Sequence, residues 1–252
     1  MKILLWDTEL APNLATVWGI WNQNIGLNQL LETSRLICYA AKWYGEKEVI
    51  FDSEHQSDHE DMVRGLHKLL DEADAVVTYN GDKFDRGVIN REFLLYGIEP
   101  PTPYHSIDLL RVVKKRFRFV SNKLDNVCNE LGLGGKVKHE GHELWLKCMD
   151  GEDKAWGKME KYNKQDVKLL EKLYKKLLPW IQNHPNHGLY TNTDRPVCTN
   201  CGSTRVEKCG TYSTKEANYQ RYRCKSCWTP MRAKQMTDNL EKRKSILTQA
   251  KI

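Results

Sequence analysis

Short apolar runs bounded by polar turns fill the first part of the chain, a pattern typical of strands. The run Ile3-Leu4-Leu5-Trp6 opens the sequence and predicts a buried strand. Aromatic and β-branched residues, which favour a pleated surface, are concentrated in the next three apolar segments. These segments, predicted as antiparallel companions of the first strand, are residues 15–21, 36–44 and 49–51.

Apolar residues change to helical spacing after residue 57. Met62, Leu66 and Leu70 lie on one face of a helix predicted over residues 58–71, and Asp58 is a suitable N-cap. Further helices are predicted over residues 84–96, 108–117, 121–131 and 153–178, and further strands over 75–79 and 104–107. Strands first, then helices alternating with strands, predict an α/β fold in which helices flank a mixed sheet.

The composition fits a folded chain with one sizeable core and a small appendage. The chain has 252 residues, of which 40% are hydrophobic and 29% charged. No apolar run approaches the roughly 18 residues that a membrane helix needs. No charged and then apolar leader opens the sequence. We therefore expect a soluble, cytoplasmic protein, in the host cytoplasm if the source is viral.

The net charge of +6 is unevenly distributed along the chain. Residues 195–252 contain 13 Lys and Arg and 4 Asp and Glu, a net charge of +9, so residues 1–194 carry a net charge of −3. A small cationic module beside a near-neutral one favours a polyanionic partner for the module. On charge alone, a solubilising tail is the simpler explanation.

Four of the eight cysteines form two C-x-x-C pairs, Cys198 with Cys201 and Cys224 with Cys227. In a chain without a leader, this spacing indicates metal binding rather than disulfides. Four thiolates complete a closed, tetrahedral, structural zinc site. The gap between the pairs is slightly longer than is usual in zinc ribbons, and a hairpin loop would absorb it. Cys209 is predicted to be a small packed residue rather than a ligand.

Residues 183–196, dense in Asn, Pro, Gly and Thr, predict a linker before the cysteine module. Its His184 and His187 have no nearby cysteine or acid that would form a ligand set, so we do not assign them to a metal. The cysteine module is predicted to span residues 197–236. Residues 237–252 are expected to form a polar, Lys-rich tail, either as a short helix or without order.

Asp7 and Glu9 follow the first apolar run and are separated by one residue. On a strand, alternate side chains leave the same face, so these two carboxylates lie about 7 Å apart along the chain. Two carboxylates on one face of a buried strand repel each other unless a cation lies between them. The pair therefore points to a metal site, although the same pattern occurs at the frayed end of a surface strand.

Two later segments carry further acids. Asp85 ends residues 79–85 (YNGDKFD), where a buried strand turns into a helix, and open sheets place ligands at such turns. Asp166 lies four residues after Tyr162 on one face of the long helix, and an inward-facing Asp in a helix needs a partner. Each has a simpler alternative, because Asp82 or Asp85 can cap a helix and Asp166 can lie at the edge of a helix surface.

Together, D-x-E on the first strand, N-x₄-D after a buried strand and Y-x₃-D on a late helix resemble the motifs of the DnaQ-like 3′–5′ exonucleases. This family belongs to the ribonuclease-H-like superfamily, and Tyr in the last motif is typical of its DEDDy subgroup. The resemblance covers about residues 1–182 and includes residues 105–110 (HSIDLL), which look like the family's fifth strand and the helix after it. It implies a ribonuclease-H-like mixed sheet of five strands flanked by helices.

The resemblance also implies roles for the motif residues. Four carboxylates would hold two Mg²⁺ or Mn²⁺ ions, which favour oxygen ligands and support an in-line displacement. These carboxylates would be Asp7, Glu9, Asp85 and Asp166. Tyr162 would orient the attacking water. We choose Asp85 over Asp82 because the family's acid follows an aromatic residue, here Phe84, and we expect a structural or supporting role for Asp108.

Several polar residues are predicted to contact substrate. In the first domain these are Asn80, Lys136, Lys138 and His139, of which the last three lie in a Gly/Lys/His loop. A plain solvated loop is an equally good explanation of that segment. In the cysteine module they are Arg221 and Arg223.

The cysteine module looks like the zinc ribbons of insertion-sequence transposases and similar DNA-processing proteins. Its basic residues are interleaved with Tyr212, Tyr219, Tyr222 and Trp228, which suits phosphate contact combined with base stacking. Such ribbons also dock onto proteins, and replication or recombination proteins are the alternative partners.

We therefore predict a nuclease with an exonuclease domain over residues 1–182 and a zinc ribbon that aids nucleic-acid binding. It would hydrolyse DNA from the 3′ end and release nucleoside 5′-monophosphates. The polarity and the exonuclease mode rest on the resemblance. A structure-specific endonuclease or an RNA-trimming ribonuclease of the same fold is the nearest alternative. A non-catalytic nucleic-acid-binding adaptor is a more distant alternative, and the presence of all four acids and Tyr162 argues against it.

Overall fold

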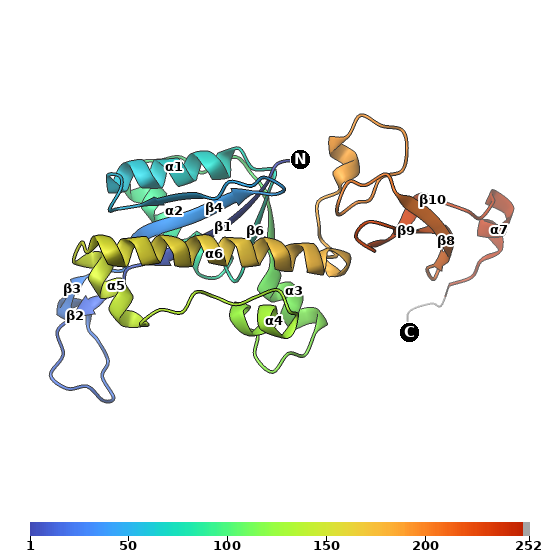
Figure 1. Ribbon diagram of the computed structural model, residues 1–252. Helices are drawn as coiled ribbons and strands as arrows, with labels where there is room; N and C mark the ends of the chain where they lie inside the picture. The colour runs from blue at the N-terminus through green and yellow to red at the C-terminus, as the bar shows by residue number, and fades with distance from the viewer. Residues whose placement is uncertain (249–252) are drawn as a thin grey trace. The chain divides into compact units, whose positions relative to one another are not determined.

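The computed structural model describes residues 1–248. The chain divides into two compact units, Met1–Tyr174 and Lys175–Ile252 (Figure 1). The last four residues of the predicted 237–252 tail lie outside the described residues. Among the described residues, no helix combines the length and the apolar character needed to cross a bilayer.

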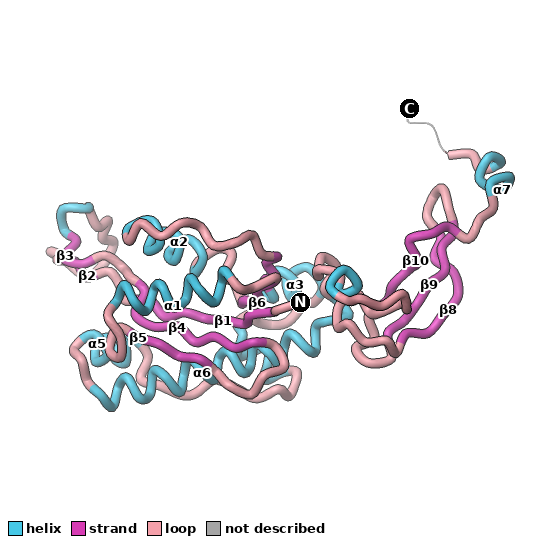
Figure 2. The backbone as a smooth tube through the Cα atoms, turned by 90° about the horizontal axis from the view of Figure 1, so that it is seen from above, coloured by secondary structure: helices cyan, strands magenta, loops and turns pink. Residues whose placement is uncertain are grey.

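The first unit contains a five-stranded mixed sheet. Its strands, in spatial order, are β5 (Ile50–Ser53), β4 (Leu36–Trp43), β1 (Ile3–Leu10), β6 (Ala75–Thr78) and β7 (His105–Asp108). β1 runs antiparallel to β4 and parallel to β6, so it lies at the centre with a partner on each edge (Figure 2). The predicted mixed sheet of five strands is thereby confirmed.

Six helices accompany this sheet. They are α1 (His59–Asp71), α2 (Asp85–Leu95), α3 (Leu109–Arg116), α4 (Leu124–Glu130), α5 (His142–Met149) and α6 (Asp153–Leu177). The side chain of Asp58 caps α1 as predicted, accepting a hydrogen bond from the backbone N of Glu60 at 2.9 Å. The pattern had not indicated α5, an eight-residue helix that begins after Gly141.

The alternation of β1 divides the core of the first unit between the two faces of the sheet. Leu4 and Trp6 pack on one face with side chains of α1 and α2, such as Leu66. On the other face, β4 packs against α5 and α6 through residues such as Cys38. Glu9 is paired with Cys38 across the ladder, and cross-strand partners share a face, so Asp7 and Glu9 face α6.

The strand predicted over residues 15–21 is wrong. β2 (Leu14–Ala15) is only two residues long and pairs with β3 (Leu30–Glu32) in a separate small sheet, next to the 3-10 helix η1 (Leu27–Gln29). Residues 16–26 form no strand. The reason lies in the sheet, because β4 and β6 occupy both edges of β1 and leave no edge for a third companion.

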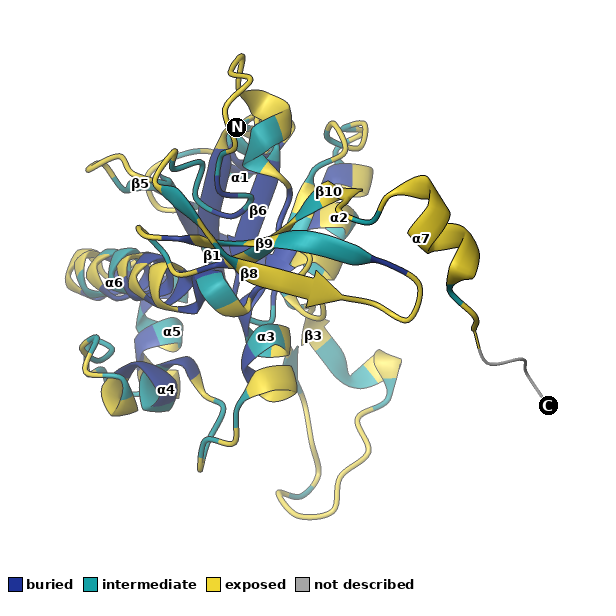
Figure 3. Cartoon of the chain, turned by 90° about the vertical axis from the view of Figure 1, so that its right-hand side faces the viewer, coloured by how far each residue is buried: buried dark blue, intermediate teal, exposed yellow. Residues whose placement is uncertain are grey.

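The second unit is built on an antiparallel sheet of three strands in the order β10-β9-β8. These strands are β8 (Val206–Ser213), β9 (Asn218–Cys224) and β10 (Pro230–Met236), and α7 (Leu240–Ser245) follows them. Figure 3 shows that this sheet is largely intermediate or exposed, whereas the central strands of the first unit are buried.

Residues 175–182, predicted as the end of the first domain, belong to the second compact unit. They include the end of α6 and the 3-10 helix η2 (Leu178–Trp180). The amide nitrogen Nδ2 of buried Asn200 donates to the carbonyl oxygens of Leu178 and Ile181, at 2.8 and 2.9 Å. These bonds fix this segment to the first C-x-x-C pair, and the 3-10 helix η3 (His187–Tyr190) lies between the two.

Candidate functional site

Three of the predicted carboxylates converge in the first unit. Asp7, Glu9 and Asp166 each offer a ligand oxygen, and these oxygens all lie within 4.8 Å of one another. β1 presents the first two on the face that α6 covers, and α6 carries the third. The residues of two distant motifs are thus brought together by the packing of the long helix on the central strand.

Asp85 belongs to the same electrostatic site but lies outside that group of three. It is the first residue of α2, and its Oδ1 accepts a hydrogen bond from Thr8 Oγ1. Its negative charge contributes to raising the pKa values of Asp7 and Glu9. Because Thr8 stands between the two acids of β1, this bond ties the start of α2 to the strand end that carries them.

Desolvation and mutual repulsion make these four carboxylates, here called the carboxylate site, costly to ionise. Desolvation, with the charges of Glu9 and Asp166, raises the pKa of Asp7 well above its ordinary value. Desolvation and the charge of Asp166 raise the pKa of Glu9 to about 8. Desolvation also raises the pKa values of Asp85 and Asp166. Such a cluster is stabilised when cations are bound between its members.

The donor set fits divalent cations that prefer oxygen. All the converging ligand atoms are carboxylate oxygens, the ligands favoured by Mg²⁺ and Mn²⁺. Oδ1 of Asp166 is buried and has no hydrogen-bond partner among the described residues. A buried carboxylate oxygen without a partner is unfavourable in a folded protein, and coordination of a metal would satisfy it.

Lys136 lies inside this site rather than on the surface of its loop. Its ammonium group forms an ion pair with Asp166 and donates to the phenol oxygen of Tyr162 at 3.0 Å. Desolvation lowers the pKa of Lys136, but the charge of Asp166 outweighs it and the net pKa is raised, so the ammonium stays charged. Desolvation, followed by the charge of Glu9, raises the pKa of Tyr162, so its phenol stays protonated.

Asn163 is a site residue that the sequence had not indicated. It is fully buried, and its Nδ2 donates to Asp7 Oδ2 at 2.9 Å. Its own Oδ1 has no partner among the described residues. The sequence signal that could have identified it is its position, since Asn163 is a polar residue next to Tyr162 on the side of α6 that faces the sheet. Thr8 had likewise been passed over, although it lies between the two predicted acids.

The other two acids near the predicted motifs have structural partners. Asp82 accepts a hydrogen bond from Ser106 Oγ at 2.6 Å and forms an ion pair with Arg111 at 3.1 Å. Asp108 is the N-cap of α3, and its Oδ1 also accepts from the backbone N of Asn80 at 2.9 Å. Asp108 therefore holds the turn before Asp85 in place.

Besides Lys136, the predicted substrate-binding residues of the first unit are Asn80, Lys138 and His139. Asn80 adopts a left-handed conformation with φ of 73°, in the turn between β6 and α2. The ring of His139 lies 4.7 Å from that of Tyr162, centroid to centroid, and 5.2 Å from that of Trp145. Lys138 is exposed.

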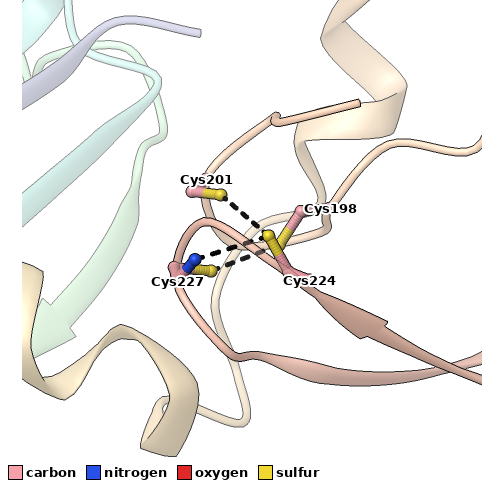
Figure 4. Close-up of side chains that lie close together, drawn as sticks. All are labelled: Cys198, Cys201, Cys224 and Cys227. Carbon is pink, nitrogen blue, oxygen red and sulfur yellow. Dashed lines mark hydrogen bonds between the residues drawn. The ribbon is translucent and has the colours of Figure 1, made fainter. Parts of the chain in front are cut away.

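The second unit brings its four cysteines together, here called the cysteine quartet. Sγ of Cys198 lies 3.5 Å from Sγ of Cys227, and Sγ of Cys201 lies 3.6 Å from Sγ of Cys224 (Figure 4). Four thiolates around zinc at about 2.3 Å lie roughly 3.8 Å apart. The quartet therefore fits a closed tetrahedral zinc site, with no fifth cysteine, since Cys209 lies outside the described group.

Both C-x-x-C turns of the quartet end on a residue in the left-handed region. These residues are Gly202, with φ of 69°, and Trp228, with φ of 65°. Glycine adopts this conformation without strain, whereas tryptophan does not. Trp228 is nevertheless 61% exposed, so packing does not impose its conformation.

The two arginines predicted to contact substrate lie on β9, and both are exposed. Arg221 donates to the carbonyl oxygen of Cys209 through Nε and Nη2, at 2.9 and 2.7 Å. His184 and His187, which we had not assigned to a metal, belong to no metal-ligand group among the described residues.

Comparisons with known proteins agree with this architecture. The family model RNase_H_2, of the RNase H superfamily, matches residues 26–178. The family B DNA polymerase from the hyperthermophilic archaeon Pyrobaculum calidifontis has a similar structure, with a TM-score of 0.53 and 17% sequence identity. The match covers 71% of this chain and 24% of the polymerase chain, and at this identity it concerns the fold alone. No curated protein matches the sequence.

Proposed function

The chain belongs to the RNase H superfamily, and from that premise we propose that it is a 3′–5′ exonuclease of the DEDDy type. In this proposal it hydrolyses DNA phosphodiester bonds from the 3′ end and releases nucleoside 5′-monophosphates. One observation carries the proposal: carboxylates of β1 and α6 converge within 4.8 Å, and the ion pair of Lys136 with Asp166 brings the Tyr162 phenol to the same place.

The carboxylate site would hold the metal ions. When bound, two Mg²⁺ or Mn²⁺ ions would activate a water for in-line attack on the phosphorus and stabilise the attacking and leaving oxygens. Asp7, Glu9, Asp85 and Asp166 would supply the ligands. Asn163 holds the Asp7 carboxylate through its Nδ2, and Thr8 holds that of Asp85. Such supporting bonds orient ligands and raise metal affinity.

Tyr162 would position the attacking water through its hydroxyl group. Because the pKa of its phenol is raised, it serves as a hydrogen-bonding group and not as a base. Lys136 holds this hydroxyl at 3.0 Å and offsets part of the negative charge of the site. A positive charge at this point would also favour the approach of a phosphate.

The second unit would bind the substrate outside the reaction centre. Its sheet exposes basic residues beside aromatic rings, and the guanidinium carbon of Arg232 lies 4.1 Å from the ring centroid of Tyr219. A zinc ion in the cysteine quartet would fix two turns, one before β8 and one between β9 and β10. This combination favours nucleic acid as the ligand of the ribbon, through phosphate contacts and stacking.

Hydrolysis of oligonucleotides labelled at one end tests the proposal. With Mg²⁺ or Mn²⁺, DNA labelled at its 5′ end should give a ladder that shortens in steps of one nucleotide. DNA labelled at its 3′ end should release labelled mononucleotide from the start. Discrete internal cuts would make the protein an endonuclease, and hydrolysis of RNA alone would make it a ribonuclease. Absence of cleavage on all these substrates would support a non-catalytic binding protein.

A further inference from the structure

A charge-free loop beside the first strand is the most exposed apolar feature of the first unit. Residues 16–26, here called the tryptophan loop, connect β2 to η1. Trp18 is 101% exposed and Trp21 is 80% exposed, and Ile20 between them is equally accessible. Figure 1 shows this loop, in blue, extending away from β2 and β3.

The base of the tryptophan loop is held by specific hydrogen bonds. The backbone N of Thr16 donates to the carbonyl oxygen of Gln29 at 2.9 Å, and Gln29 Nε2 donates back to the carbonyl oxygen of Thr16 at 3.0 Å. Gln29 Oε1 also accepts from the backbone N of Gly26 at 2.9 Å. One side chain thus closes both ends of the loop, which presents its tip on a fixed base.

Two exposed indole rings in one short loop indicate a binding site. Trp usually buries most of its surface, and contiguous exposed apolar patches commonly mark interaction sites. The loop gains nothing for the core from Trp18 or Trp21, since neither belongs to a buried cluster among the described residues.

The composition of the loop indicates what that ligand is. Residues 16–26 contain no Lys, Arg, Asp, Glu or His. Phosphates are therefore not its target. Its polar side chains are the amides of Asn22, Gln23 and Asn24. Indole faces stack on bases, and amides donate to and accept from base edges.

The position of the loop along the chain supports the same ligand. Trp18 lies nine residues after Glu9, so the two Cα atoms are at most about 30 Å apart. That span equals about nine stacked nucleotides at 3.4 Å each. A strand of about nine nucleotides whose terminal phosphate lies at the carboxylate site is thus long enough to reach the loop.

We propose that the tryptophan loop binds the bases of single-stranded nucleic acid, by stacking on Trp18 and Trp21, a few nucleotides away from the carboxylate site. This inference rests on the proposed function, since the bound strand is the one that the carboxylate site would cleave. It adds a contact that recognises bases and ignores phosphates, in contrast to the basic ribbon of the second unit.

Binding of a fluorescently labelled twelve-nucleotide DNA strand tests this inference. The full chain carries Asp7→Asn in every sample, so that bound DNA stays intact. Trp18→Ala combined with Trp21→Ala should weaken binding by roughly 100-fold, about tenfold for each stacked base. The slope of log Kd against log salt should stay unchanged, because no phosphate contact is lost. Trp18→Phe with Trp21→Phe should restore most of the affinity.

Two controls make the result specific to bases. A strand of abasic residues keeps its phosphates, so the protein with intact tryptophans and the double alanine variant should bind it equally. Val120→Ala, at a side chain that is 97% exposed, should leave affinity unchanged. Unaltered affinity of the double alanine variant for normal DNA would overturn the inference and leave a protein as the partner of the loop. An equal loss on abasic DNA would also overturn it.

The exonuclease proposal and the proposal of base binding by the tryptophan loop can be refuted independently. If the unmodified protein cleaves nothing but binds DNA in a tryptophan-dependent way, the exonuclease proposal fails and the loop proposal stands. If it cleaves DNA and the double alanine variant binds as tightly as the intact loop, only the loop proposal fails.

Discussion

The carboxylate site and the cysteine quartet each collect four side chains of one type, but the chain assembles them in opposite ways. The carboxylates come from β1, α2 and α6, elements that lie far apart in the sequence. The cysteines come from two short turns that lie close to one another in the sequence. The first site depends on the packing of a large hydrophobic core. The second unit has almost no such core, and its four cysteines hold the fold together instead.

The burial of hydrophobic side chains quantifies this difference. Both faces of the large sheet carry extensive buried clusters, so the first unit can hold four repelling acids on β1, α2 and α6. Between residues 190 and 248, the buried hydrophobic side chains are only Cys198, Ala217 and Cys224. Small modules with so little core usually require a metal to fold. We infer that metal serves chemistry in the first unit and folding in the second.

Cys224→Ser should therefore have the largest effect on stability, and only in the second unit. Structural zinc contributes on the order of 10 kcal/mol of binding free energy, far more than the remaining core of the ribbon can supply. The unmodified protein should carry one zinc ion per chain, measured by elemental analysis, and the substituted protein should lose that zinc and the protection of its ribbon against proteolysis. Cys209→Ser is the matched control and should keep the zinc. Retention of a protease-resistant ribbon by the Cys224→Ser protein would refute the inference.

Tyr162→Phe should separate catalysis from stability in the first unit. Loss of the hydroxyl that would position water should lower kcat on the order of 100-fold, with little change in the unfolding temperature. Tyr79→Phe is the matched control, because the Tyr79 hydroxyl donates to the carbonyl oxygen of Asn122 at 2.6 Å, outside the site. That control should lose about 1 kcal/mol of stability and keep its turnover. An unchanged kcat in Tyr162→Phe would remove Tyr162 from the mechanism.

Asn163→Ala should reveal how much the carboxylate site depends on its supporting bonds. Without the donor to Asp7 Oδ2, the metal affinity should fall about 10- to 100-fold. The measurement is the Mg²⁺ concentration at half-maximal hydrolysis. Gln165→Ala, which removes a weaker 3.4 Å bond from α6 to the carbonyl oxygen of Gly135, should leave that concentration unchanged. The same Mg²⁺ requirement in both variants would mean that Asp7 needs no positioning.

The smallest effect is expected at the left-handed residues of the cysteine turns. Trp228→Gly should stabilise the ribbon by roughly 1 kcal/mol, because glycine removes the backbone strain of a φ of 65°. It should also weaken nucleic-acid binding if the exposed ring stacks on bases. Gly202→Ala should destabilise the ribbon, since a Cβ there would lie 3.1 Å from His187 Nδ1. Thermal unfolding of the ribbon measures both, and a lower unfolding temperature in Trp228→Gly would contradict the strain argument.

Local patterns predicted the parts of the molecule that depend on local physics. Asp58 was recognisable as a helix cap because capping needs only a suitable side chain two residues before the backbone N of Glu60. The cysteine quartet was recognisable because its spacing is set within two short turns. The strand predicted over residues 15–21 failed because aromatic content reports only a local preference, whereas β4 and β6 already pair with both sides of β1.

The carboxylate site was predictable in part, because some of its features depend on local spacing and others on tertiary packing. Alternation predicted that Asp7 and Glu9 share a face, and the ordered motifs predicted which distant acids join them. Neither could predict that Lys136 turns inward to Asp166, or that Asn163 supports Asp7, because both depend on how the 134–141 loop and α6 pack. Sequence spacing determines which residues are candidates, and tertiary packing determines their partners.

We propose that the carboxylate site hydrolyses DNA with the help of bound metal. The most direct test compares the hydrolysis of end-labelled DNA, in Mg²⁺, by the unmodified protein and by Asp7→Asn and Asp166→Asn. We predict stepwise shortening by the unmodified protein, and a loss on the order of 10³-fold or more in both variants with normal unfolding of the first unit. Undiminished hydrolysis in both variants would show that these carboxylates do not carry the reaction.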